Sequence, residues 1–253
     1  FMDSGWDVKH MVKLMVMSDT YRQTSATSQK LQERDPANRL LARQSSFRLD
    51  AEMVRDSALA ISGLLVDKVG GPSVKVYQPA GYWDMLNFPK RTYESDHGPS
   101  QYRRGLYTFW CRTFLQPSVQ AFDASSREEC TVERVNSNTP LQALALLNDP
   151  TYVEAARVLA EQVVRKAGTN VEDRINWTFM RALDRLPNPE EFTVLNGFAR
   201  KQINRYATNT ADAGKLISAG EWPVPKDLEA PELAAWTSIS RVVLNLHETI
   251  TRY

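Results

Sequence analysis

Apolar residues in the first quarter of the chain follow helical spacing in two stretches that a polar run separates. Between residues 6 and 17 they recur every three or four positions, which predicts a helix. The polar run over 22–34, rich in Ser, Thr and Gln, predicts a loop. A longer apolar stripe over 47–66 predicts a second helix, which we expect to end at Gly70 and Gly71.

The polar side of this second predicted helix carries two acids and two arginines. Glu52 and Asp56 lie one helical turn apart. Residues at this spacing are neighbours on a helix surface. We therefore expect the two acids to share Arg55 or Arg48 on an exposed face.

The second half of the chain is rich in signals for helix starts. A side chain that can cap a helix directly precedes a proline at Thr139-Pro140, Asp149-Pro150 and Asn188-Pro189. With the apolar periodicity that follows, the sequence predicts helices over 140–147, 150–167, 171–186, 189–206 and 231–251. Residues 208–231 contain several Gly and Pro and predict an irregular connector.

The region between the two helical parts has a different pattern. Repeated Pro and Gly over 71–99 exclude a long regular element, and the aromatic residues spaced through it indicate an ordered loop packed on the helices. Residues 102–113 are dense in Tyr, Phe, Trp and Thr, which favours a short strand or an extended buried segment.

These patterns predict a mainly α fold, a helical domain with a long, ordered, aromatic-rich loop region and one short β-hairpin at about 71–135. The 253 residues are compatible with a single core. We treat 1–253 as one helical domain, a fragment of a longer protein. It subdivides into 1–135, the first helices with the aromatic loop region, and 136–253, a helical bundle.

The composition limits the kinds of partner that we expect. The 31 basic and 30 acidic residues balance, so charge gives no reason to expect nucleic acid. No stretch approaches the roughly 20 apolar residues that span a bilayer, so we expect no membrane span in this segment. Cys111 and Cys130 are the only cysteines. They form a disulfide or, the interpretation we favour, are two small buried side chains.

Signatures of metal and nucleotide chemistry are missing from the sequence. His10, His97 and His247 are isolated, with no spacing typical of metal ligands, so we expect no metal. No phosphate-binding glycine loop, nucleophile elbow or haem-attachment motif is present, so we expect no cofactor in this segment.

The stretch over 102–148 and the loop before it combine arginines with aromatic rings. Guanidinium groups bind carboxylate, phosphate or sulfate oxygens, and aromatic rings stack on sugars or cations. An anionic or sulfated saccharide fits this mixture, whereas the alternative is a buried network that holds the fold together. The candidate ligand-binding residues are Tyr77, Trp83, Arg103, Arg104, Trp110, Arg112, Asp123 and Arg127.

The same region carries a family likeness. Its motifs are Gly71-Pro-Ser-Val74 with Tyr77-Gln-Pro-Ala-Gly81, Tyr102-Arg-Arg with Leu106-Tyr-Thr-Phe-Trp110, Phe122-Asp-Ala-Ser-Ser-Arg127, and Asn138-Thr-Pro-Leu-Gln-Ala-Leu144 with Leu147-Asn-Asp-Pro150. Together they resemble a planctomycete-specific C-terminal domain of unknown function found in planctomycete cytochrome c-like domain proteins. The resemblance covers nearly the whole chain.

The resemblance implies a location and a set of accompanying domains, but it implies no reaction. Such domains end long exported proteins whose upstream parts include a cytochrome c-like domain, so haem c is expected in an upstream domain and the location is periplasmic or extracytoplasmic. We therefore expect a non-catalytic binding or assembly module that contacts a polysaccharide or an upstream domain of its own polypeptide.

Two alternatives stay open. A carbohydrate-active hydrolase or lyase would need two carboxyl groups roughly 5–10 Å apart. The acids to inspect first are Asp123, Glu128, Glu133 and Glu52. A docking surface for an upstream haem domain in electron transfer would instead present a flat, weakly charged face.

Overall fold

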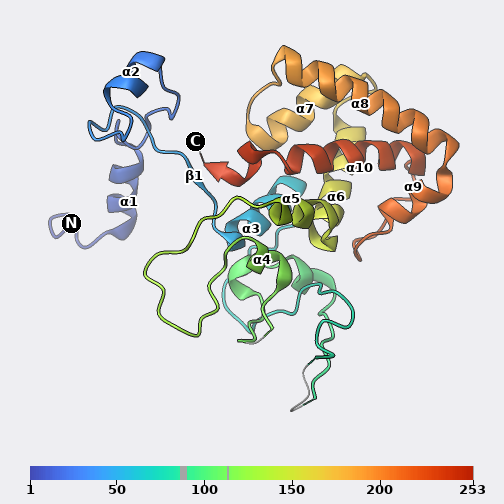
Figure 1. Cartoon of the computed structure of the whole chain (residues 1–253), viewed down its shortest axis with the longest axis horizontal. Coiled ribbons are helices and arrows are strands. Elements are labelled where there is room, and N and C mark those ends of the chain that lie inside the picture. Colours follow the sequence, from blue (N-terminus) through green and yellow to red (C-terminus); the bar gives the residue numbers. More distant parts are fainter. Residues whose placement is uncertain (86–89, 113, 253) are drawn as a thin grey trace. The chain divides into compact units, whose positions relative to one another are not determined.

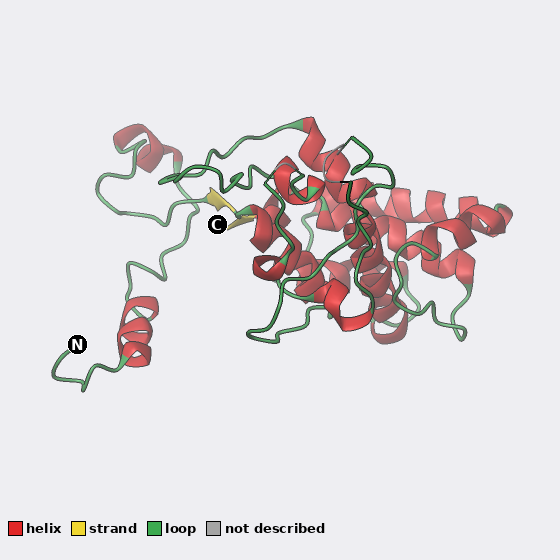
Figure 2. Ribbon diagram, turned by 90° about the horizontal axis from the view of Figure 1, so that it is seen from below, coloured by secondary structure: helices red, strands yellow, loops and turns green. Residues whose placement is uncertain are grey.

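The computed structural model describes residues 1–85, 90–112 and 114–252. The chain divides into two compact units. The first contains Phe1–Arg48 and the residues from Thr251 onward, and the second contains Leu49–Ile250. Helices dominate, and the strands in the described part form one short antiparallel pair (Figure 2), which confirms the predicted fold class.

The first unit contains two helices and the strand pair. These elements are α1 (Val8–Val16), α2 (Gln29–Arg34), β1 (Phe47–Arg48) and β2 (Thr251–Arg252). Helix α1 begins where predicted, because the Asp7 side chain accepts a hydrogen bond from the backbone N–H of His10 at 3.1 Å. Helix α2 lies in the run that we predicted to be a loop. Its cap is Ser28, whose hydroxyl accepts a hydrogen bond from the Leu31 N–H.

No residue of α1 is buried, although the helix is strongly amphipathic. Val8, Val12 and Met15 lie on one side of it and are each about half exposed or more. This unit therefore shows an apolar helix face that its own residues leave uncovered.

The strand pair joins distant parts of the sequence. Phe47 pairs with Arg252, and Arg48 with Thr251. We expected the short β element within 71–135. The described residues of that range take part in β pairing only through isolated bridges, one between Val74 and Thr108 and one between Arg103 and Val66, which lies just before the range.

The second unit holds the remaining elements (Figure 1). They are α3 (Ala51–Ser62), the 3₁₀ turns η1 (Gly98–Tyr102) and η2 (Gly105–Tyr107), α4 (Pro117–Ala121), α5 (Pro140–Asn148), α6 (Pro150–Lys166), α7 (Val171–Leu183), α8 (Pro189–Thr208), α9 (Thr210–Ile217), α10 (Ala230–Leu244) and the 3₁₀ turn η3 (His247–Ile250). The starts of α5, α6 and α8 match the predicted Pro positions. Helix α9 lies in the predicted irregular connector, and α4 is an element that the sequence patterns did not reveal.

Helix α3 ends earlier than predicted. Gly63 has a φ of 79°, and its N–H closes the last turn onto the Ala60 carbonyl. The Gly70 and Gly71 pair lies beyond this end, in a loop that returns toward 98–107. The left-handed cap at Gly63, in an otherwise apolar stripe, therefore decides where the helix ends.

Two hydrophobic clusters form the core of this unit, and α6 contributes to both. Tyr152, Ala155 and Leu159 pack with α3 in the first cluster, whereas Ala160 and Val163 pack with α7, α8, α9 and α10 in the second. Helix α10 contacts α6, α8 and α9 and carries the fully buried Trp236. The aromatic loop region lies at the α3 end of the unit, between α3 and α5 in sequence.

Candidate functional site

The aromatic loop region is held by a buried arginine. The Arg103 side chain, only 6% exposed, donates hydrogen bonds to the carbonyl oxygens of Pro72 at 2.8 Å, Lys68 at 3.1 Å and Gly70 at 2.5 Å. Its guanidinium also lies 3.8 Å from the centre of the Tyr107 ring. Arg103 therefore stabilises the backbone of the 68–72 loop of this chain.

A second arginine fixes the same segment to α3. Arg55 is fully buried and donates to the Arg103 carbonyl at 2.6 Å and to the Gln101 carbonyl. Burial lowers the pKa of Arg55, and the nearby carboxyls of Asp56 and Asp149 partly offset this effect. The expected sharing of Arg55 on an exposed face is thus wrong, because this side of α3 packs against 98–107.

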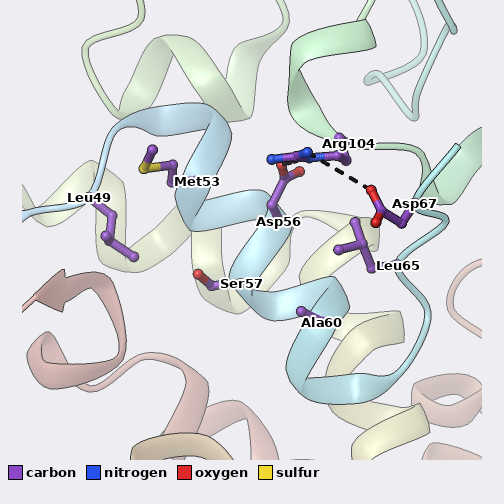
Figure 3. A pocket seen from close by; sticks show the side chains of 8 residues that line it. All are labelled: Leu49, Met53, Asp56, Ser57, Ala60, Leu65, Asp67 and Arg104. Carbon is purple, nitrogen blue, oxygen red and sulfur yellow. Dashed lines mark ion pairs between the residues drawn. The ribbon is translucent and has the colours of Figure 1, made fainter. Parts of the chain in front are cut away.

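Arg104, the next residue, points to the surface beside a hollow of about 460 Å³ along α3 (Figure 3). We call this the α3 hollow; it is lined by Leu49, Met53, Asp56, Ser57, Ala60, Leu65, Asp67 and Arg104. The Arg104 Nε lies 3.6 Å from Asp56, and one terminal nitrogen lies 3.9 Å from Asp67. The hollow thus has an apolar floor and a charged rim.

The rim is negative on balance, with two carboxylates against one guanidinium. Burial raises the pKa of Asp56, although its carboxylate accepts a 2.6 Å hydrogen bond from the Gly105 N–H and lies near Arg55 and Arg104. Its charge is therefore incompletely compensated, and a further cation at this rim would be favourable.

A second hollow, of about 550 Å³, lies between α4, α5 and the turn at 81–85. We call it the Asp149 hollow; it is lined by Tyr82, Pro117, Ser118, Gln120, Ala121, Leu141, Ala145 and Asp149. Burial raises the pKa of Asp149, against hydrogen bonds from Thr151 and Ser118 and the charge of Arg55. A mostly apolar hollow with a few polar groups is typical of small-molecule sites.

Three further predicted binding residues make internal contacts. The Tyr77 hydroxyl donates to Glu154 at 3.3 Å. Trp83 is buried between Tyr93 and Phe114 and donates its indole N–H to Gln78. Asp123 accepts hydrogen bonds from the backbone and hydroxyl of Ser137 at 2.8–2.9 Å.

The other predicted residues lie at the surface in separate contacts. The Arg127 guanidinium stacks 4.1 Å from the centre of the half-buried Trp110 ring. The Arg112 side chain, 71% exposed, lies 3.6 Å from Glu128. The structure does not gather the eight residues into one site, and of these eight Arg104 alone lines either of the two hollows.

The four acids considered for catalysis have different surroundings. Glu52 is held by Arg134 through two hydrogen bonds, at 2.6 and 3.1 Å. Asp123 is bonded to Ser137 and Glu128 lies beside Arg112, whereas Glu133 is exposed. The carboxyls that line the two hollows are Asp56, Asp67 and Asp149 instead.

A buried acid that the sequence patterns did not single out ties the aromatic loop to the connector before α10. Glu154 has no exposed surface and accepts hydrogen bonds from Tyr102 at 3.0 Å and from the Trp222 N–H at 2.6 Å, besides Tyr77. Burial raises its pKa. The sequence signal was the acid–arginine pair of Glu154 and Arg157, three residues apart on α6, whose charged atoms lie 3.9 Å apart.

Cys111 and Cys130 are free thiols. Cys111 is half-buried and Cys130 is exposed in a surface loop, so the favoured expectation of two buried side chains is wrong. Within 1–85, 90–112 and 114–252, no three His, Cys, Asp or Glu side chains form a group that could hold a metal ion. In the same residues, no helix has the length and apolar character that crossing a bilayer requires.

The hollows, the arginine contacts and the motifs of the loop region all fall inside one family match. The model of the family PSD1, described as a protein of unknown function (DUF1553), matches residues 1–199. The chain belongs to this family. The match includes both hollows entirely, and the last part of α8, α9 and α10 lie beyond it. No curated protein matches the chain, and no solved structure matches it.

Proposed function

We propose that the chain is a non-catalytic assembly module of an exported, cytochrome-associated polypeptide. In this proposal the α3 hollow receives a helix from an upstream domain of the same polypeptide. The observation that carries it is the exposed apolar strip of α3 with its acidic rim. The exported setting and the haem-bearing neighbour come from the family resemblance.

The shape of the strip favours a helix as its occupant. Met53, Ser57 and Ala60 follow each other at spacings of four and three residues, so they form a line along α3. From Met53 to Ala60 this line covers about 10 Å, or two helical turns. Side-chain ridges of one helix pack into such a groove on another.

The charge of the strip favours a basic occupant. Asp56 and Asp67 outnumber Arg104 at the rim, and complementary charges beside an apolar contact select the partner and its orientation. The incoming helix should therefore carry a Lys or Arg next to its apolar residues.

The first unit adds support. Helix α1 leaves Val8, Val12 and Met15 uncovered, with Lys9 and Lys13 on an adjoining side of the same helix. Exposed apolar surfaces of this kind mark protein interaction sites. An assembly module explains both surfaces, because a domain of the same polypeptide would cover them.

Thiol labelling tests the proposal. Met53→Cys and, as the matched control, Met180→Cys are placed in a background with Cys111→Ser and Cys130→Ser. Met53 is 53% exposed on α3, and Met180 is 44% exposed on α7. The rate of maleimide labelling is measured in this chain alone and in the whole polypeptide.

We expect labelling at position 53 to be at least tenfold slower in the whole polypeptide, while position 180 reacts at similar rates in both. Equal rates at position 53 in the two proteins would contradict docking at the α3 hollow.

A further inference from the structure

The Asp149 hollow has a lining that the assembly proposal does not use. Its walls are apolar at Pro117, Ala121, Leu141 and Ala145, and Tyr82 adds an aromatic ring. Polar groups come from Ser118, Gln120 and Asp149. Its volume of about 550 Å³ falls within the range of about 300–1,000 Å³ that is usual for small-molecule sites.

The aromatic wall is held in place before any ligand arrives. The Tyr82 hydroxyl donates to the Leu115 carbonyl at 3.0 Å, and its ring meets Phe114 edge to face at 5.6 Å. On the opposite side, α5 is fixed at its start by the capping box of Thr139 and Gln142. Both walls are therefore preorganised, which lowers the entropic cost of binding.

The carboxyl of Asp149 has unused hydrogen-bonding capacity. It accepts from the Thr151 N–H at 2.9 Å, from the Thr151 hydroxyl and from Ser118, so about one acceptor position is left. A carboxylate offers about four acceptor positions. A ligand with hydroxyl groups can therefore donate to it.

The electrostatics favour a neutral ligand. Asp149 lines the hollow and opposes an anion, whereas the buried Arg55 within electrostatic range of Asp149 partly offsets its charge and weakens the attraction for a cation. A neutral ligand with an apolar face for Tyr82 and hydroxyl groups for Asp149 and Gln120 fits this lining. A sugar ring has these properties on its two sides.

We propose that the Asp149 hollow binds one ring of a neutral sugar. Tyr82 packs against the apolar face of the ring, and Asp149 accepts hydrogen bonds from its hydroxyl groups. The exposed Gln120 amide contacts a hydroxyl at the mouth of the hollow. This site is separate from the α3 hollow, so either proposal can fail without the other.

Helix α5 provides a matched pair of variants for the test. Leu141 and Leu144 are 60% and 54% exposed, and of the two only Leu141 lines the hollow. Leu141→Glu, Leu144→Glu and Gln120→Ala are compared with the unmodified chain. Circular dichroism checks that each variant is folded. Saturation-transfer NMR measures binding of the neutral probes cellobiose, maltose and xylobiose, with glucosamine and glucuronic acid as charged probes.

We expect at least one neutral probe to bind with a dissociation constant of about 1 mM, the weak end of specific recognition. Leu141→Glu should weaken that binding at least tenfold and Gln120→Ala about threefold, while Leu144→Glu leaves it unchanged. Three results would each overturn the proposal: no neutral probe binds, a charged probe binds more tightly than the neutral ones, or Leu144→Glu weakens binding as much as Leu141→Glu.

Discussion

Arg103 and Arg104 are adjacent in sequence, but their surroundings are opposite. Arg103 is buried and donates to three carbonyl oxygens of the 68–72 loop. Arg104 is half exposed, and its contacts with Asp56 and Asp67 are long. The same residue type therefore stabilises the fold on one side of the segment and shapes a surface on the other. The comparison shows that a cluster of arginines and rings is not one functional unit.

Removal of Arg103 should have the largest effect. Arg103→Ala removes the buried charged donor from the carbonyls of Lys68, Gly70 and Pro72. Hydrogen bonds to charged groups contribute about 1.5–3 kcal/mol each and are not additive, so the free energy of unfolding should fall by about 3 kcal/mol or more. Urea denaturation measures this change. A variant as stable as the parent would show that the loop does not depend on Arg103.

The next largest effect on stability should come from the contact between Gly105 and α3. A Cβ on Gly105 would lie 2.9 Å from the Cα, Cβ and carbonyl oxygen of Glu52, so Gly105→Ala must push the segment away from the helix. Such overpacking costs about 1–3 kcal/mol. Gly214→Ala in α9 is the control, because its Cβ meets nothing within 4 Å. There we expect a gain of about 0.5–1 kcal/mol from helix propensity.

Local rules predicted much of the fold in the helical half. The caps at Thr139, Asp149 and Asn188 precede proline and fix the helix starts, because the rule involves only neighbouring residues. The short helices α2, α4 and α9 have too few turns for a clear apolar period. The end of α3 depends on the left-handed conformation of Gly63, which an apolar stripe around it obscures.

The candidate site was less predictable, because burial depends on distant segments. The sequence showed that 77–127 is rich in arginines and aromatic rings. The packing of the 98–107 segment on α3, however, decides that Arg103 is buried and Arg104 exposed. Tyr82 and Asp149 share a hollow although they are far apart in sequence. Asp149 was predicted as a helix cap, and this local role gave no indication of the hollow beside it.

The buried Glu154, which anchors the loop, should make the stability of the fold depend on pH, with an effect of intermediate size. Burial raises the pKa of Glu154 above its usual 4.5. Its contribution to stability is therefore fully present below pH 4.5 and is lost as the pH rises through the raised folded-state pKa. Glu154→Gln has no such loss. Thermal melting should show Glu154→Gln gaining stability relative to the parent as the pH rises from 4 to 7.

Glu52→Gln is the control of opposite sign. Burial alone would raise the pKa of Glu52, but the hydrogen bonds and charge of Arg134 outweigh it and lower this pKa. Glu52 therefore adds stability above pH 4.5 that is lost as the pH falls. As the pH rises from 4 to 7, Glu52→Gln should therefore become less stable relative to the parent. Parallel pH profiles for the two variants would contradict the assignment of their surroundings.

Arg104→Ala should have the smallest effect on stability and a distinct effect on assembly. Exposed ion pairs contribute up to about 1 kcal/mol, so unfolding should change by no more than that. At the rim of the α3 hollow, however, the change removes the guanidinium beside Asp56 and Asp67, and only the buried Arg55 remains near Asp56. If the incoming helix is basic, docking tightens, and labelling of Met53→Cys in the whole polypeptide becomes slower still. Faster labelling in this background would mean that the partner presents an acid to Arg104 and that the proposed charge of the helix is reversed.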